Sequence, residues 1–269
     1  MNTGLRDKVV LVTGAAGGIG SAIARALAAE QARVVLHYHT NRVGAAHLRR
    51  ALGRAALPLP ADLTREAAVK RLFATALARC GRIDTLVVNA AAWEQRDVPL
   101  HAMTLRQWRR TQEGTLTSAF LCLREFLRIV ARQRAGNVVL IGSTAAVFGE
   151  ANHADYAAAK SALAFGLTRS LKNEIARLAP TTPDYCGGRV NCVCPGWTVV
   201  PRNAARLRDP ATAQRVTATM PLRKVARPED VANAVVFLAS DHLAGHLTGQ
   251  TLTVAGGMEG RLLWATETR

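Results

Sequence analysis

The sequence predicts an α/β fold in which one doubly wound, mainly parallel sheet carries helices on both faces. Three observations predict it. Short runs rich in β-branched residues alternate with longer stretches of helical periodicity. A glycine-rich turn separates the first of these runs from the first helical stretch. No linker, repeat or low-complexity tract divides the 269 residues, so we expect a single domain over residues 1–269.

Seven strands and six helices are expected in alternation. The strand segments are apolar and β-branched, as strands buried on both faces are. They cover Val9–Val12, Arg33–Tyr38, Ala55–Leu59, Thr85–Asn89, Asn137–Gly142, Val190–Val193 and Thr251–Val254. The helical segments repeat apolar residues every three or four positions. They cover Ile19–Glu30, Val43–Leu52, Arg65–Cys80, Thr104–Arg134, Asp155–Leu178 and Pro228–Ala239.

Two segments depart from this alternation. Residues 180–188 are predicted to form a loop because proline, glycine and aspartate dominate them. Residues 197–220 follow Pro195-Gly196 and are irregular, then weakly helical. Loops that follow the carboxyl ends of parallel strands border the ligand crevice of an α/β sheet. We therefore expect residues 197–220 to form a lid over a substrate.

Composition indicates an ordinary globular protein of the cytoplasm. Hydrophobic residues make up 49% and charged residues 20% of the chain, which is typical of such proteins. No segment approaches the roughly 18 uninterrupted apolar residues of a membrane span, so no membrane partner is expected. Residues 1–8 lack the apolar core of a signal peptide. Five scattered cysteines suit a reducing compartment better than a disulfide framework.

The net charge of +16 raises the question of a nucleic-acid partner. The basic residues are spread along the whole chain, and no aromatic residues are interleaved with them to stack on bases. We expect no nucleic-acid partner, and attraction of anionic ligands is the milder consequence. No metal site is expected either, because Cys192 and Cys194 fall on one face of a predicted strand and no other pair has zinc-site spacing.

The glycine-rich turn has the properties of a phosphate site. Gly14, Gly18 and Gly20 lie between the first strand and the first helix. Glycines there allow a tight turn and a close approach to a pyrophosphate, while the helix start offers free N–H groups and a partial positive charge. The alternative is an ordinary glycine-rich connection between strand and helix.

The spacing Thr-Gly-xxx-Gly-x-Gly resembles the short-chain dehydrogenase/reductase family, and the resemblance extends over residues 6–258. It implies a Rossmann-type fold and a nicotinamide cofactor. Asp62-Leu63, Asn89-Ala90 and Pro195-Gly196 match family motifs at later strand ends. The resemblance implies that the cofactor contacts Gly14, Ala16, Gly18, Ile19, Gly20, Tyr38, His39, Thr40, Asp62, Leu63, Asn89, Ala90, Lys160, Pro195, Gly196 and Thr198.

Ser143, Tyr156 and Lys160 match the catalytic positions of the family. Hydride transfer to a carbonyl builds negative charge on oxygen, so a proton donor is needed at the same place. Tyrosine has a pKa near 10, and an ammonium about 4 Å away favours tyrosinate by roughly 4 kcal/mol, or about three pKa units. The four-residue spacing puts Tyr156 and Lys160 on one helix face. Ser143 would hold the substrate oxygen. Without the glycine-rich turn, Tyr156 and Lys160 would be interpreted as part of a solvent-exposed helix face.

Three positions depart from the family pattern. Thr115 stands where the family has an asparagine that helps to hold a proton-relay water. Either the relay uses Thr115 and its backbone, or turnover is slower. Ala91 replaces a glycine, and Val200 stands near a usual threonine whose contact Thr198 could make instead.

The second strand bears on the choice of cofactor. NAD-type members carry an aspartate at the position of Tyr38, and no acid is present in this segment. His39, Thr40 and Arg42 could donate to a 2′-phosphate. NADP(H) is therefore favoured, with NAD(H) as the alternative.

Together these features predict an oxidoreductase that interconverts a small-molecule carbonyl and alcohol. A cofactor-binding sensor or scaffold of low activity is the alternative, kept open by Thr115. The substrate side is expected to include Trp93, Ser143, His153 and Trp197. Small residues along 157–166 would suit helix packing between subunits, and the resemblance implies a homotetramer or homodimer.

Overall fold

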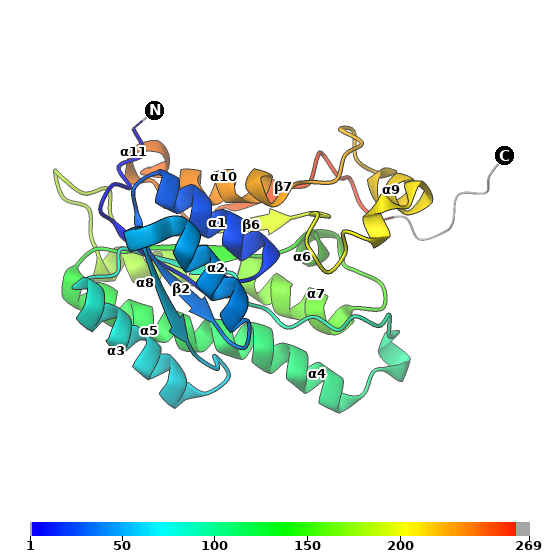
Figure 1. Ribbon diagram of the computed structural model, residues 1–269, viewed down its shortest axis with the longest axis horizontal. Coiled ribbons are helices and arrows are strands. Elements are labelled where there is room, and N and C mark those ends of the chain that lie inside the picture. The colour runs from blue at the N-terminus through cyan, green and yellow to red at the C-terminus, as the bar shows by residue number, and fades with distance from the viewer. Residues whose placement is uncertain (1, 262–269) are drawn as a thin grey trace.

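The computed structural model describes residues 2–261 and contains one seven-stranded sheet (Figure 1). The strand order is β3-β2-β1-β4-β5-β6-β7, and every neighbouring pair is parallel. The strands are β1 (Val9–Val12), β2 (Arg33–Tyr38), β3 (Ala56–Pro60), β4 (Thr85–Val88), β5 (Asn137–Ile141), β6 (Arg189–Pro195) and β7 (Thr251–Val254). The predicted doubly wound sheet is confirmed, and its strands lie within two residues of their expected bounds.

Helices fill the connections between strands. They are α1 (Gly18–Ala29), α2 (Arg42–Leu52), α3 (Glu66–Cys80), α4 (Leu105–Gln112), α5 (Ser118–Gln133), α6 (Thr144–Phe148), α7 (Ala154–Ser161), α8 (Thr168–Leu178), α9 (Pro210–Thr217), α10 (Pro228–Ala239) and α11 (Asp241–Ala244). Short 3-10 turns cover Gly53–Ala55, Leu100–Ala102 and Arg206–Arg208. Among the described residues, none of these helices is long and apolar enough to cross a membrane.

Two long helices predicted from periodicity are each interrupted by a wider turn. A π-helical turn over Glu113–Thr117 joins α4 to α5, and a second over Ala162–Leu167 joins α7 to α8. The apolar periodicity continues through both turns, so the sequence predicted one helix in each case. A π turn shifts the helix face after it and is often found at functional sites.

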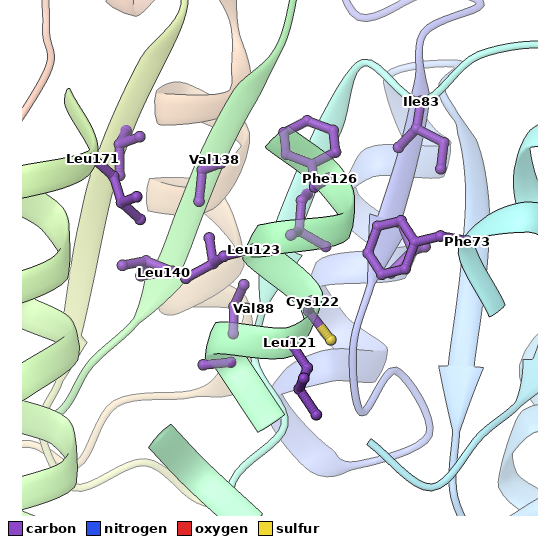
Figure 2. Packing of buried hydrophobic residues seen from close by; sticks show 14 of the residues in the cluster. Phe73, Ile83, Val88, Leu121, Cys122, Leu123, Phe126, Val138, Leu140 and Leu171 are labelled. Atoms are coloured by element: carbon purple, nitrogen blue, oxygen red, sulfur yellow. The ribbon is translucent and has the colours of Figure 1, made fainter. Parts of the chain in front are cut away.

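The core has two layers, one on each face of the sheet. Alternate residues of a strand point to opposite faces, so Val10 and Val12 pack under α1 and α10 while Val9 and Leu11 face the other side. That second layer is built mainly from α3, α5 and α8. Figure 2 shows Phe73 of α3 and Phe126 of α5 in this layer, with Val138 and Leu140 of β5.

The order in which the strands are connected determines where the ligand crevice is expected. The chain runs outward from β1 through β2 to β3, then returns to β4 on the other side of β1 and continues to β7. The carboxyl ends of β1 and β4 therefore form the point where the strand order reverses, which is where α/β sheets bind ligands. Helix α9, which lies within the segment expected to form a lid, is found at one end of the molecule (Figure 1).

Candidate active site

The turn between β1 and α1 presents free backbone N–H groups. Gly14 has φ +64°, a left-handed conformation that favours glycine. Gly17 caps α1 without any side-chain hydrogen bond, so the first N–H groups of the helix, at Gly18, Ile19 and Gly20, have no cap. Uncapped N–H groups at the positive end of a helix dipole fit a pyrophosphate. The residues present therefore fit the phosphate end of a dinucleotide.

His37 fixes this turn to the neighbouring strands. The Gly14 N–H donates to His37 Nδ1 (3.0 Å), and Nε2 donates to the Ala61 carbonyl (3.0 Å). Burial lowers the His37 pKa to about 4, and the hydrogen bond to Ala61 opposes that effect. The imidazole is thus neutral at pH 7, with its proton on Nε2. Our sequence reasoning missed this residue, although its inward position in β2 was a signal.

Thr13 and Asn89 join the ends of β1 and β4. Thr13 Oγ1 accepts from the N–H groups of Asn89 (2.8 Å) and Ala90 (3.0 Å). In return, Asn89 Nδ2 donates to the carbonyls of Thr13 (2.9 Å) and Gly14 (3.2 Å). Asn89 and Ala90, expected as cofactor residues, therefore lie directly against the glycine-rich turn. Thr13 was not expected as a site residue.

The end of β2 carries the residues expected at the ribose. Tyr38 ends β2 half-buried, and His39 and Thr40 follow it exposed. Asn41 Nδ2 donates to the Ala16 carbonyl (2.9 Å), while its Oδ1 accepts from the Gly44 N–H and caps α2. The first turn of α2 begins at Arg42 and contains no acid.

A groove continues from His39 along the end of β3. Asp62 and Arg65 help to line it. Asp62 accepts from the Thr64 hydroxyl (2.7 Å), which is the main cause that lowers its pKa, and Leu63 is buried beside it. This groove lies where the resemblance places the adenine.

Ser143, Tyr156 and Lys160 meet at the carboxyl end of β5. Ser143 follows the strand as the N-cap of α6, and its Oγ accepts from the Ala145 N–H (3.1 Å). Lys160 is buried in α7, and its Nζ donates to the Ile141 carbonyl (2.6 Å). Nζ lies 5.7 Å from the centroid of the Tyr156 ring. Burial raises the pKa of Tyr156, and a hydrogen bond with the Ser143 side chain opposes that rise.

Asp155 anchors the start of α7. Its buried carboxylate accepts from Thr111 Oγ1 (2.7 Å) and Gln107 Nε2 (3.3 Å) of α4, and from the Tyr156 N–H (2.9 Å). These bonds tie the residue next to Tyr156 to a neighbouring helix. An acid in the first turn of a predicted helix was the one sign of this role in the sequence.

Thr115 lies in the π turn between α4 and α5, fully buried. Its hydroxyl accepts from the Ala92 N–H (3.0 Å) and donates to the Ala92 carbonyl (3.3 Å). The side chain is therefore committed to holding the segment after β4.

The rings of Trp93 and His153 lie beside Tyr156. Trp93 and His153 have ring centroids 4.2 Å apart, and the Trp93 ring meets the Tyr156 ring edge-on at 4.5 Å. His153 Nε2 hydrogen-bonds Asp97 Oδ1 at 3.0 Å. Arg202 of the lid places its Cζ 5.6 Å from the centroid of the Trp93 ring. Arg202 was not among the expected site residues.

The lid segment is fastened at its base and touches the glycine-rich turn. Gly196 donates its N–H to the Val254 carbonyl (3.0 Å), and Thr198 Oγ1 donates back to the Gly196 carbonyl (3.0 Å). Trp197 packs against a small cluster of Met220, Ala255 and Met258 rather than with the Trp93 rings. Farther along, Val200 covers Gly18 so closely that a Cβ there would lie 2.6 Å from Val200 Cγ1.

Comparison with known proteins decides the family. A family model described as enoyl-(acyl carrier protein) reductase matches residues 14–259. The chain belongs to the short-chain dehydrogenase/reductase family. It is 38% identical to cis-4-hydroxycyclohexanecarboxylate dehydrogenase from Sinomonas cyclohexanicum, over 96% of this chain and 98% of that protein. It is 34% identical to 3-oxoacyl-[acyl-carrier-protein] reductase from Synechocystis, over 95% and 98%.

Solved structures agree with this short-chain dehydrogenase/reductase assignment. The crystal structure of a gluconate dehydrogenase candidate from Agrobacterium tumefaciens superimposes with a TM-score of 0.86 at 29% identity, covering 96% of this chain and 98% of that one. The relatives are named dehydrogenases and reductases, so this short-chain dehydrogenase/reductase is an oxidoreductase acting on CH–OH and C=O groups. The sensor or scaffold alternative is not favoured.

Burial has the largest effect on the pKa values of Tyr156 and Lys160 in this short-chain dehydrogenase/reductase. The sequence predicted that Lys160 favours the tyrosinate, and in the structure burial opposes this and raises the Tyr156 pKa to about 12. Burial also lowers the Lys160 pKa to about 8. The physical reason is that both side chains lose water, and the Lys160 ammonium is directed to the Ile141 carbonyl.

Two thiols lie close to Lys160 in this short-chain dehydrogenase/reductase. Cys192 and Cys194 of β6 are buried with their Sγ atoms 3.9 Å apart, and both act to raise the Lys160 pKa. Within residues 2–261 no group of three His, Cys, Asp or Glu side chains is arranged to hold a metal ion.

Proposed function

We propose that the protein reduces a carbonyl to an alcohol, or catalyses the reverse, with NADP(H) as cofactor. The observation that carries this proposal is the meeting of Ser143, Tyr156 and Lys160 at the carboxyl end of β5. Because the strands are parallel, this is the same edge of the sheet as the glycine-rich turn. A bound nicotinamide would supply or accept the hydride.

The side chains of Tyr156, Ser143 and Lys160 would then donate the proton and stabilise the charge that forms. Tyr156, with a pKa raised by burial to about 12, is protonated at neutral pH and can donate to an oxygen that gains negative charge. Ser143 would hydrogen-bond the same oxygen and hold it against the tyrosine. Lys160, with a pKa of about 8, carries its charge at neutral pH and favours the tyrosinate left after transfer.

The preference for NADP(H) rests on the end of β2. His39 and Arg42 are exposed at the start of α2, and neither that turn nor Tyr38 offers a carboxylate. A 2′-phosphate would find cationic donors and a helix N-terminus there, whereas an acid would repel it.

Replacing Tyr38 by aspartate tests this preference. We expect Tyr38→Asp to raise the KM for NADPH by at least about tenfold, since a carboxylate beside a phosphate costs more than about 1.4 kcal/mol, and to lower the KM for NADH. Initial rates with both cofactors measure it, and Tyr38→Asn is the uncharged control. An unchanged NADPH/NADH ratio in Tyr38→Asp would contradict the proposed cofactor preference.

We also propose a homodimer or homotetramer in the cytoplasm. Phe120 on α5 leaves 48% of its surface exposed, with Arg124 over its ring, which suits a contact between subunits. All five cysteines are free, as in a reducing compartment. Light scattering of the purified protein measures the assembly, and a monomer at micromolar concentration would contradict it.

A substrate panel tests the proposed reaction. The names of the relatives specify a hydroxylated cyclohexane ring and a 3-oxoacyl thioester. We therefore expect NADPH oxidation with at least one cyclic ketone or 3-oxoacyl ester, and less with NADH. Absence of turnover with every carbonyl, in the presence of tight NADPH binding, would contradict the reaction while leaving cofactor binding intact.

A further inference from the structure

The guanidinium of Arg202 lies beside the candidate active site and has no ion-pair partner among residues 2–261. Three acids lie on the segments around it, and each has its own partner. Glu94 pairs with Arg96 and Arg110. Asp97 accepts from His153, and Glu150 lies 3.6 Å from Arg261. Within residues 2–261 no carboxylate reaches the guanidinium of Arg202.

Trp93 holds this charge next to the catalytic tyrosine. The indole ring lies 5.6 Å from Arg202 Cζ and 4.5 Å from the Tyr156 ring centroid, so one aromatic ring separates the two groups. Stacking on His153, which is buried and bound to Asp97, fixes the orientation of Trp93. A guanidinium over an indole is a stable cation–π arrangement that leaves its N–H groups open to an anion.

The positive charge of Arg202 affects the pKa values of Tyr156 and Lys160. Burial dominates the pKa of Tyr156 and raises it, and Arg202 is the next cause and opposes that rise. Burial is the main cause that lowers the pKa of Lys160, the two cysteines oppose it, and the charge of Arg202 adds to the lowering. A ligand anion bound to Arg202 would thus lie within electrostatic reach of Tyr156.

A second polar group in the cluster has no partner. His153 Nδ1 is buried and forms no hydrogen bond within the described residues. Buried polar atoms without partners are rare, because each costs the free energy of its lost hydration. The atom belongs to the ring that stacks on Trp93.

We infer that the substrate is an oxo or hydroxy acid, whose carboxylate binds Arg202 over the Trp93 ring while its carbonyl or hydroxyl group meets Tyr156. This inference rests on the proposed oxidoreductase function. A carboxylate matches the planar fork of a guanidinium, and an apolar ring or short chain between the two ends would lie on the indole. Arg202 would then determine specificity without taking part in the proton transfer.

A matched pair of substrates tests this inference. The probes are 4-oxocyclohexanecarboxylate and 4-oxocyclohexanecarboxamide, which share a ring and differ by one charge. We expect the wild-type protein with NADPH to favour the acid in kcat/KM. Arg202→Gln should lower kcat/KM for the acid by about tenfold to a hundredfold, the range for a hydrogen bond to a charged group, and change the amide by less than about threefold. Arg202→Lys should recover part of the loss.

Arg206→Gln is the matched control, because it removes the same charge from the same exposed segment. It should leave the preference for the acid unchanged. Equal wild-type rates for acid and amide, or an equal loss of both in Arg202→Gln, would overturn the inference while the oxidoreductase function stands.

Calorimetry with the non-reacting cyclohexanecarboxylate, in the presence of NADP⁺, separates the two proposals. If neither ketone turns over but this acid binds wild type and not Arg202→Gln, the proposed reaction fails and the anion subsite survives. If neither turnover nor a difference in binding is found, both are overturned.

Discussion

At the scale of single residues, His37 shows how a side chain away from the reacting atoms shapes the cofactor site. Its ring accepts from Gly14 and donates to Ala61, so it can serve both bonds only in the neutral form with the proton on Nε2. Burial keeps it neutral by lowering its pKa from 6.5 to about 4. Protonation would remove the acceptor that holds the glycine-rich turn.

This residue predicts a dependence of stability on pH. Because the pKa of His37 is lower in the folded than in the unfolded protein, its contribution is fully present above about pH 6.5 and is lost as the pH falls towards 4. The loss amounts to about 3 kcal/mol, from a shift of roughly 2.5 pKa units. Urea unfolding of wild type and His37→Gln at pH 7 and pH 4.5 measures it.

The wild-type protein should lose more stability than His37→Gln over this interval. His47→Gln, which replaces an exposed histidine on α2, should follow the wild type. Parallel pH profiles for wild type and His37→Gln would show that the imidazole is not the group that titrates.

Thr115 gives a second prediction at this scale. Thr115→Val keeps the shape of the side chain but leaves the Ala92 N–H without its acceptor, which should lower the free energy of unfolding by about 1–3 kcal/mol. We expect kcat to stay within a fewfold of wild type, since the hydroxyl is already engaged by Ala92. Thr115→Ser, which keeps the hydroxyl, should restore the stability. A loss of kcat to background in a folded Thr115→Val would instead assign proton relay to the hydroxyl.

At the scale of elements, α7 delivers Tyr156 and Lys160 because α4 holds its first turn. The buried carboxylate of Asp155 accepts hydrogen bonds from two side chains of α4 and from the Tyr156 N–H. The position of Tyr156 therefore depends on a helix that contributes no group to the reaction.

Asp155 is thus predicted to act as a positioning residue. Asp155→Ala should destabilise the fold by about 2–3 kcal/mol, because Thr111 and Gln107 lose a buried partner, and should lower kcat more than it changes KM. Asp155→Asn keeps one acceptor oxygen and should recover part of kcat. Glu174→Ala, an exposed acid on α8, is the control. If Asp155→Ala lost stability with kcat unchanged, its role would be structural only.

The interrupted helices show where sequence reasoning reaches its limit at this scale. Apolar periodicity predicted one helix over 104–134 and one over 155–178, and both stretches are helical at either end. The π turns at Glu113–Thr117 and Ala162–Leu167 insert extra residues without breaking the apolar pattern. In the first of them, Thr115 bonds to Ala92, which is distant in sequence. The periodicity of apolar residues along the sequence does not depend on such a contact and cannot predict it.

At the scale of the whole molecule, the fold could be predicted, and so could the proximity of Ser143, Tyr156 and Lys160, because each has a strong local signal. Buried strands are apolar runs, and the glycine turn and the Tyr–Lys spacing are compact motifs. Thr13, His37, Asp155 and Arg202 could not be predicted, since each acts through partners brought together only by the sheet. Trp197, expected on the substrate side, packs against Met220, Ala255 and Met258.

The molecule as a whole also favours anionic ligands. A net charge of +16 attracts phosphates and carboxylates to the whole surface. The uncapped start of α1 and the guanidinium of Arg202 are two local sites that an anion could bind.

The central claim is that Tyr156 transfers the proton in a nicotinamide-dependent reduction. The most direct measurement compares kcat for NADPH-dependent ketone reduction by wild type and Tyr156→Phe, with NADPH affinity measured in parallel. We predict that kcat falls by at least about a hundredfold, the lower end of a general acid's contribution, while NADPH binding stays within a fewfold. Full activity in Tyr156→Phe would contradict the account.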